Sequence, residues 1–150
     1  METGNNYYLG GYHFGHESRL EEYFEGGCFE IGGDQNEALK KIRGIKKGDR
    51  IALKTTDIKG QKMTIKALGI VQLSNPRNDK QIFVDWKIKD LNRIIEGDLG
   101  KYVRRLIGPL EEEELIKEAF HIWLHYGKQF LLKTFSRIVA MPVITISIVR

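Results

Sequence analysis

The chain has 150 residues, 41% of them hydrophobic, which is enough for one ordinary core and too few for two large domains. A single cysteine excludes an intramolecular disulfide framework and favours the cytoplasm, and the absence of a leader or a membrane-spanning apolar segment predicts a soluble protein without membrane contact. The formal net charge of +4 is uneven, because residues 1–39 carry one arginine against eight acids, residues 40–105 carry eighteen lysines and arginines against seven acids, and residues 106–150 carry five of each.

The acidic N-terminal part indicates two strands that alternate with two short helices. Residues 7–9 predict a strand that enters the glycine-rich segment GGYHFG, where glycine permits backbone angles that other residues avoid. Ser18 and Glu21 have the spacing of a helix-capping box, and two glycines at 26 and 27 supply the stop. A strand over residues 28–31 and a second helix over residues 35–43 follow.

The basic middle part is dominated by β structure. The predicted strands cover residues 50–55, 62–73, 81–86 and 102–107, with turns at 47–49, 57–60 and 75–78. Gly69 marks a bulge or the close approach of another backbone. The segment over residues 87–100 fits either a short helix or a long connection.

The C-terminal part begins after Gly108-Pro109, which punctuates a boundary. Four consecutive glutamates open a long predicted helix over residues 111–135, where the helix dipole favours negative charge, and residues 138–149 predict a terminal strand. Part of that helix carries apolar residues on most of its faces. We therefore expect the helix to be buried by the sheet or by a second copy of the chain in a homodimer.

This order of elements predicts an α+β fold. We expect a small, curved or barrel-like, mostly antiparallel sheet with flanking helices and a long C-terminal helix. Residues 1–108 form the main domain, and residues 109–150 form an extension that either belongs to the same compact unit or serves dimerisation.

Two catalytic or metal-binding interpretations compete with simpler ones. Cys28 with His13 or His16 could form a nucleophilic Cys-His site, but the cysteine lies in a strand that reads as buried, which favours a core role. His121 and His125 lie four residues apart on one helix, yet no cysteine or acidic cluster completes a metal site.

Cofactor and nucleotide motifs give no further candidate. The glycine-rich segments match neither a phosphate-binding loop nor a dinucleotide fingerprint. We therefore expect no metal and no cofactor.

Aromatic residues near strand ends and glycine turns are the strongest candidates for a binding site. An aromatic box sandwiches a flat base through stacking worth about 1–3 kcal/mol per base, while an acid or a backbone group reads the edge of the base. The alternative is a role in the core, where aromatics are common. The candidate base-pocket residues are Tyr8, Tyr12, Phe14, Phe29, Asp85 and Trp86.

Four short motifs carry a family resemblance by their order along residues 7–107. They are GCFEIG at 27–32, IKKGDRIALK at 45–54, IKALGIV at 65–71 and VDW at 84–86. In this order they resemble PUA-like β-barrel domains, most closely the EVE and YTH-like branch that includes the N-terminal modified-base-reading domains of McrB-type restriction proteins. Residues 111–150 match nothing in that family.

The resemblance implies a reader domain without enzymatic activity of its own, which flips a modified base into an aromatic cage. Phe29 stands where such domains often place a cage tryptophan, and Trp86 with Asp85 ends a strand near the cage. The resemblance also implies a specificity module of a restriction or defence system, with a motor or nuclease protein as its partner.

The basic middle part suits a polyanion better than a neutral metabolite, although a solvated lysine-rich surface is the simpler explanation. The candidate phosphate-binding residues are Lys46, Lys47, Arg50, Lys54, Lys87, Arg104 and Arg105. We therefore expect a nucleic-acid-binding domain, with DNA favoured over RNA, that recognises a methylated or unmethylated base. The alternatives are a small enzyme acting on a nucleoside-like substrate through His13, His16 or Cys28, and a protein-interaction module built on the apolar helix.

Overall fold

The computed structural model describes residues 5–32, 36–57 and 59–121 of the chain. The chain divides into two compact units, residues 1–119 and 120–150, and every element described below belongs to the first. The strands are β1 (Tyr7–Gly11), β2 (His13–Phe14), β3 (Glu17–Ser18), β4 (Cys28–Glu30), β5 (Arg50–Thr56), β6 (Lys62–Ser74), β7 (Gln81–Ile88), β8 (Arg93–Glu96) and β9 (Leu106–Ile107). The helices are α1 (Leu20–Gly26), α2 (Asn36–Gly44), the short 3-10 turn η1 (Gly100–Tyr102) and α3 (Glu113–Ala119).

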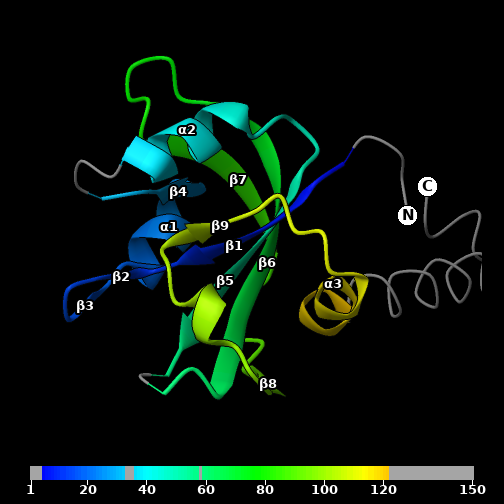
Figure 1. Ribbon diagram of the computed structural model, residues 1–150. Helices are drawn as coiled ribbons and strands as arrows, with labels where there is room; N and C mark the ends of the chain where they lie inside the picture. Colours follow the sequence, from blue (N-terminus) through cyan, green and yellow to red (C-terminus); the bar gives the residue numbers. More distant parts are fainter. Residues whose placement is uncertain (1–4, 33–35, 58, 122–150) are drawn as a thin grey trace, which may run out of the picture. The chain divides into compact units, whose positions relative to one another are not determined.

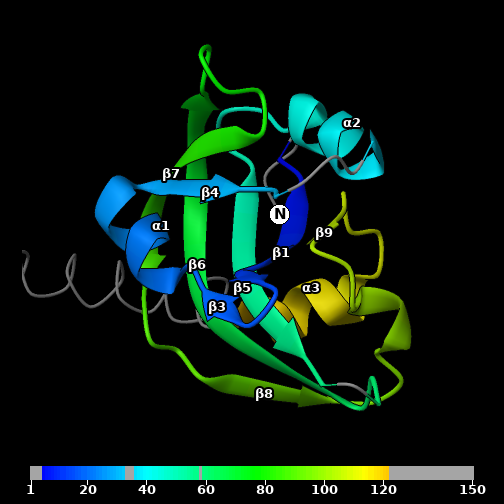
Figure 2. The ribbon, with the colours of Figure 1, turned by 90° about the vertical axis from the view of Figure 1, so that its left-hand side faces the viewer.

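Seven of the strands form one mixed sheet that curls into a half-barrel (Figures 1 and 2). The order across the sheet is β4-β7-β6-β5-β1-β9, and β8 pairs with β6 outside this path. Within it β1 runs parallel to β5, and the other pairings are antiparallel. The predicted α+β class with a curved sheet and flanking helices is therefore confirmed at the level of a half-barrel.

The curl follows from β6, a strand of 13 residues that pairs with β5, β7 and β8. Its pairing shifts register opposite the Leu53/Lys54 step and again at Leu68/Gly69, and such bulges bend a strand and increase its twist. A Cβ placed on Gly69 would lie 2.7 Å from Trp86 Cε3 and closer still to Val84 Cγ1. The bulge predicted at Gly69 is confirmed. Because this glycine has no side chain, Val84 and Trp86 of β7 can also pack close to the backbone of β6.

Replacing Gly69 with alanine is expected to lower the free energy of unfolding by about 1–3 kcal/mol, because the new methyl group overlaps two side chains with little freedom to move. Gly44→Ala is the matched control, since no atom lies within 4 Å of the position where its Cβ would be placed, and its effect is expected within about 0.5 kcal/mol. Urea denaturation followed by circular dichroism measures both. Equal stability of the two variants would contradict the close approach at Gly69.

The core lies between the concave sheet and the helices α1 and α2. Tyr8, Phe29 and Trp86 belong to it, with exposed fractions of 2%, 0% and 8%. Gly10 is required by this packing, because a Cβ there would lie 2.5 Å from Phe29 Cε1. The prediction that glycines in GGYHFG adopt unusual backbone angles is confirmed at Gly15, which has a φ of 65° between β2 and β3, and is wrong at Gly10 and Gly11, which are part of strand β1.

Three boundaries differ from the prediction. The segment 87–100, for which a short helix or a long connection was predicted, instead contains strand β8, because Arg93–Glu96 pairs with the start of β6. The strand predicted over 102–107 is shorter, since only Leu106–Ile107 is extended. At α1 the cap is Arg19 without a side-chain hydrogen bond, so the predicted capping box is absent; Ser18 Oγ instead accepts from the Leu20 N–H at 3.3 Å.

The predicted C-terminal helix is seen only in part. α3 covers Glu113–Ala119, and the remainder of the predicted helix after residue 121 and the strand predicted over 138–149 lie outside the described residues. In the part of the chain that the structure describes, no helix has both the length and the apolar character needed to cross a membrane.

Candidate functional site

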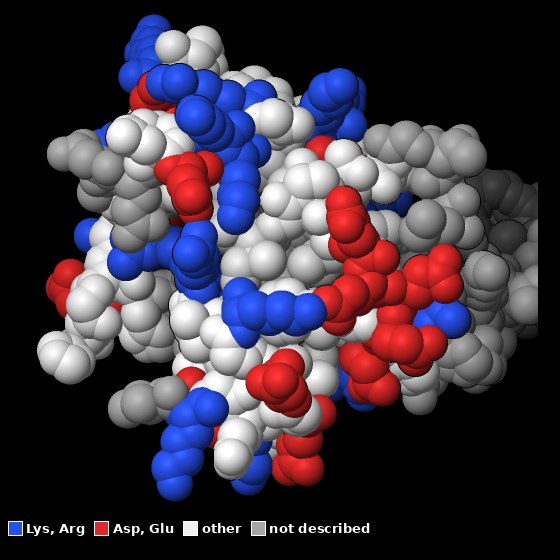
Figure 3. Space-filling view, in the orientation of Figure 1, with Lys and Arg blue, Asp and Glu red and all other residues white. Residues whose placement is uncertain are grey.

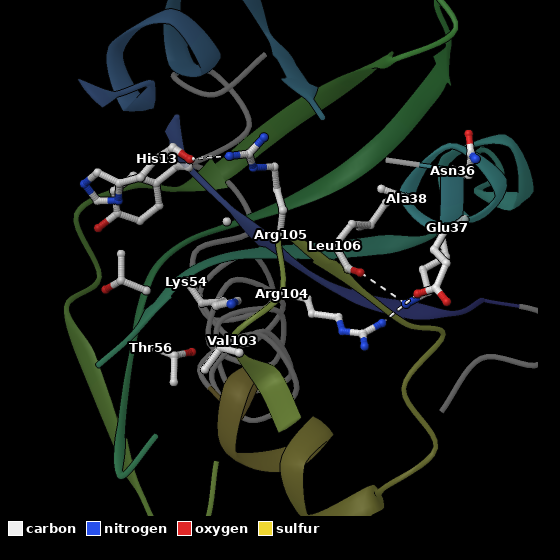
Figure 4. Close-up of a pocket in the computed structure, with 14 residues that line it drawn as sticks. His13, Asn36, Glu37, Ala38, Lys54, Thr56, Val103, Arg104, Arg105 and Leu106 are labelled. Atoms are coloured by element: carbon white, nitrogen blue, oxygen red, sulfur yellow. Dashed lines mark hydrogen bonds and ion pairs between the residues drawn. The ribbon is translucent and has the colours of Figure 1, made fainter. Parts of the chain in front are cut away.

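A cavity of about 690 Å³ lies among the end of β1, the helix α2, the strand β5 and residues 103–106 (Figure 4). Its volume falls within the range of small-molecule and cofactor sites. The wall that β1 and β5 share is set by their parallel register, which places Gly11 opposite Lys54. Because glycine has no side chain, this pairing leaves room beside the lysine.

Basic side chains dominate the charge of the cavity. In the part of the chain that the structure describes, the cavity is lined by the cations Lys41, Lys54, Arg104 and Arg105 and by one acidic side chain, Glu37. On the molecular surface, basic side chains gather over α2 and next to it, whereas acidic side chains gather over α3 (Figure 3). A concave site with this excess of cations attracts anions.

Lys54 is the buried cation of the cavity. Its side chain is 3% exposed, and its Nζ donates a hydrogen bond of 2.5 Å to the carbonyl oxygen of Tyr102. The Thr56 hydroxyl donates to the same carbonyl oxygen at 2.9 Å. Burial lowers the pKa of the Lys54 ammonium to about 8, because desolvation disfavours the charged form.

Arg104 and Lys41 hold the opposite side of the cavity with contacts that an anion can replace. Arg104 Nη1 lies 2.6 Å from Glu37 Oε2 in an exposed ion pair, and Lys41 Nζ donates to the Leu106 carbonyl at 3.3 Å. Exposed ion pairs contribute about 0–1 kcal/mol, so a phosphate or carboxylate can displace Glu37 at little cost.

Arg105 is positioned by the β2–β3 hairpin. Its guanidinium lies 4.5 Å from the centre of the Phe14 ring, and its Nη2 donates to the His13 carbonyl at 3.1 Å (Figure 4). Arg19 contacts the same ring, also at 4.5 Å. A guanidinium fixed in this way loses little side-chain entropy when it binds an anion.

Comparison with known proteins adds no family to this geometry. The chain matches no protein-family model and no curated protein. The half-barrel sheet with flanking helices is compatible with the PUA-like fold that the sequence motifs resemble. The cavity and its charges therefore carry the functional argument.

The structure disperses the predicted base-pocket residues. Tyr12 lines the cavity. Burial raises the pKa of its phenol, and the hydrogen bond with the Thr55 side chain opposes this effect but is smaller. Phe14 supports Arg105 as described above, and Tyr8 and Phe29 pack in the core. Trp86 also lies in the core, where its Nε1–H donates to the carbonyls of Tyr23 at 3.0 Å and Cys28 at 3.2 Å. Asp85 is exposed and pairs with Lys87 at 2.6 Å.

Three of the seven predicted phosphate-binding residues, Lys54, Arg104 and Arg105, line the cavity. Elsewhere, Lys46 and Lys47 are exposed at the turn before β5, Arg50 donates to the Gly48 carbonyl, and Lys87 is engaged by Asp85. Lys41 was missed by the sequence analysis. Its position four residues after Glu37 on α2, which brings both side chains to one helix face, was the available signal.

The candidate catalytic residues fall in different environments. Cys28 is buried, and burial, followed by the charges of Glu30 and Glu22, raises the pKa of its thiol and disfavours the thiolate. His13 and His16 are exposed on the β2–β3 hairpin. Among the described residues no cluster of three His, Cys, Asp or Glu side chains could hold a metal ion, and His125 lies outside them.

Proposed function

We propose that this chain is a nucleic-acid-binding domain that receives one nucleotide unit in its cationic cavity. The observation that carries the proposal is the convergence of Lys41, Lys54, Arg104 and Arg105 on a cavity of nucleotide size. Phosphate oxygens are the ligands that arginine forks and lysine ammonium groups bind best in such a setting. Among the described residues that line the cavity, Glu37 is the only acid that competes with them.

The aromatic wall supports a base as well as a phosphate. Tyr12 is 4% exposed and lines the cavity close to His13, whose ring centroid lies 4.6 Å from that of Tyr12. Thr55 and Thr56 add hydroxyl groups to the same wall. The exposed His13 ring, which packs on Tyr12, can stack on a base, and the hydroxyl groups can bind the polar edge of that base.

The resemblance to PUA-like readers extends the proposal to its biological role. On that basis the chain reads a methylated or otherwise modified base in DNA and acts as a specificity module that works with a motor or nuclease protein. The half-barrel supports this extension at the level of fold.

Binding to single-stranded and double-stranded oligonucleotides is expected to weaken steeply as salt rises, because phosphate contacts release counterions. Arg104→Ala is expected to reduce the slope of log K against log salt by about 1, as expected for one lost phosphate contact. Fluorescence anisotropy over a salt series, with methylated and unmethylated oligonucleotides in parallel, measures both effects.

Arg43→Ala is the matched control for this test. Arg43 is an exposed arginine 2.8 Å from Asp79, so it resembles Arg104 in its ion pair but does not line the cavity. Its salt slope is expected to equal that of the unmodified chain. Salt-independent binding, or equal slopes for the two variants, would overturn the proposed cavity.

A further inference from the structure

Lys54 differs from an ordinary phosphate-binding lysine in its surroundings. Such lysines are usually exposed and strongly hydrated, whereas Lys54 is 3% exposed. Among the described residues its ammonium has one hydrogen-bond acceptor, the carbonyl oxygen of Tyr102, and no carboxylate partner. The cavity therefore contains a buried primary amine that has no carboxylate partner among the described residues.

Three further cationic side chains line the cavity that Lys54 lines. Lys41 from α2 and Arg104 and Arg105 from the segment before β9 line the same cavity. Glu37, the one acid among the described lining residues, forms an ion pair with Arg104. Desolvation and neighbouring cations are the two devices by which proteins make a lysine amine nucleophilic. Burial is the cause of the lowered pKa of Lys54, about 8.

We infer that Lys54 is a nucleophile that captures an aldehyde group carried by a bound nucleic acid, an inference that rests on the proposed nucleic-acid binding. Aldehydes react with amines without activation, whereas phosphodiesters and ordinary bases do not. Nucleic acids carry an aldehyde in the ring-opened sugar of an abasic site and in a formyl pyrimidine. The arginines of the cavity would hold the flanking phosphates in either case.

The reaction needs no oxidant or reductant. The lone pair of the neutral Lys54 nitrogen attacks the carbonyl carbon, and one N–H proton moves to the carbonyl oxygen to give a carbinolamine. The second N–H proton and the hydroxyl group then leave as water, and a C=N bond remains. The imine is hydrolysed by the reverse steps, so the capture is reversible.

Thr56 is placed to assist the proton transfers. Its hydroxyl and the Lys54 amine donate to the same carbonyl oxygen, at 2.9 Å and 2.5 Å, so the two groups lie side by side. The hydroxyl oxygen retains lone pairs with which to relay a proton between the nitrogen and the departing oxygen.

The experiment traps the imine by reduction. The full chain is incubated with an oligonucleotide that contains one abasic site, one that contains 5-formylcytosine, and one that contains a tetrahydrofuran in place of the abasic sugar, each with sodium cyanoborohydride. Denaturing gels measure the covalent adduct, and peptide mass spectrometry locates it. The tetrahydrofuran oligonucleotide has no aldehyde and serves to measure binding by anisotropy without covalent capture.

We expect an adduct with one or both aldehyde oligonucleotides, located on Lys54, and none with the tetrahydrofuran oligonucleotide. Lys54→Arg removes the amine nucleophile, so the adduct is expected to fall by about tenfold or more when each protein is saturated with the aldehyde oligonucleotide, as judged from its own titration with the tetrahydrofuran oligonucleotide. Lys62→Arg, an exposed lysine near Glu96 and away from the cavity, should leave the adduct yield unchanged.

Two results would overturn the inference alone: binding of the tetrahydrofuran oligonucleotide with no adduct from either aldehyde, and an adduct spread over several lysines of the unmodified chain. The second readout does not require any variant to fold. Absence of binding to the tetrahydrofuran oligonucleotide would overturn the proposed function together with this inference.

Discussion

Trp86→Ala is expected to lower the free energy of unfolding by about 3–5 kcal/mol, the range for removing a large aromatic side chain from a packed core. The indole is 8% exposed and contacts the Phe24 ring edge-on at a centroid distance of 6.0 Å. Its N–H also joins α1 to β4, because the two carbonyls that accept from it belong to Tyr23 and Cys28. Truncation therefore removes packing and a link between two elements at once.

Urea denaturation followed by circular dichroism measures this loss. Trp86→Phe separates the two contributions, since it keeps an aromatic ring and removes the shared N–H donor, and an intermediate loss is expected. Leu73→Ala is the control, because Leu73 is 53% exposed and its effect is expected within about 0.5 kcal/mol. Unchanged stability of Trp86→Ala with a selective loss of binding to one base would contradict the core role and restore the predicted cage role.

The elements that the sequence predicted well are those whose pattern is local. The strands around residues 50–55, 62–73 and 81–86 and the helix over residues 35–43 are confirmed within a few residues, because alternation of polar and apolar residues and glycine stops are visible in a short window. The bulge at Gly69 was predictable for the same reason, since a glycine within a β-branched run is a local signal.

Strand β8 and the burial of Lys54 depend on distant residues and had no such signal. β8 has four residues, of which Ile94 is 60% exposed and Ile95 is 7% exposed, and it forms because it pairs with the start of β6. Lys54 continues a run of buried residues in β5 only because β1 pairs with it in parallel and the Tyr102 segment covers it. A charged residue at the end of a strand reads as exposed from sequence alone.

The same dependence on distant residues explains why the sequence did not separate core aromatic residues from cavity-lining ones. Aromatic residues such as Tyr8, Tyr12 and Phe29 are common both in cores and in base pockets. Strand pairings between segments far apart in the chain determine the side of the sheet that each of them faces. The basic character of residues 40–105 was visible, whereas the convergence of Lys41 from α2 with Arg104 and Arg105 required the fold.

Lys54→Met is expected to raise the free energy of unfolding at pH 7 by about 3 kcal/mol, because burial has lowered the pKa of this ammonium from 10.5 to about 8 and each pKa unit corresponds to about 1.4 kcal/mol. Methionine fills a similar volume without a charge to desolvate. The same variant is expected to bind nucleic acid more weakly, since the cavity loses a cation. A residue that costs stability and supports binding is typical of a functional site.

The pH dependence of this difference gives the sharper test. Between pH 8 and pH 10.5 the unfolded chain holds the Lys54 proton and the folded chain has released it, so the contribution of Lys54 to the free energy of unfolding rises with pH across this window. Below pH 8 both states are protonated at Lys54, so the cost of the buried charge is present in full there. Other groups, such as the tyrosines, titrate alike in both chains, and the difference between Lys54→Met and the unmodified chain therefore isolates Lys54. Denaturant titrations at pH 7, 8, 9 and about 10.5 should show the advantage of the variant shrinking towards zero, whereas a constant difference would contradict a buried amine at this position.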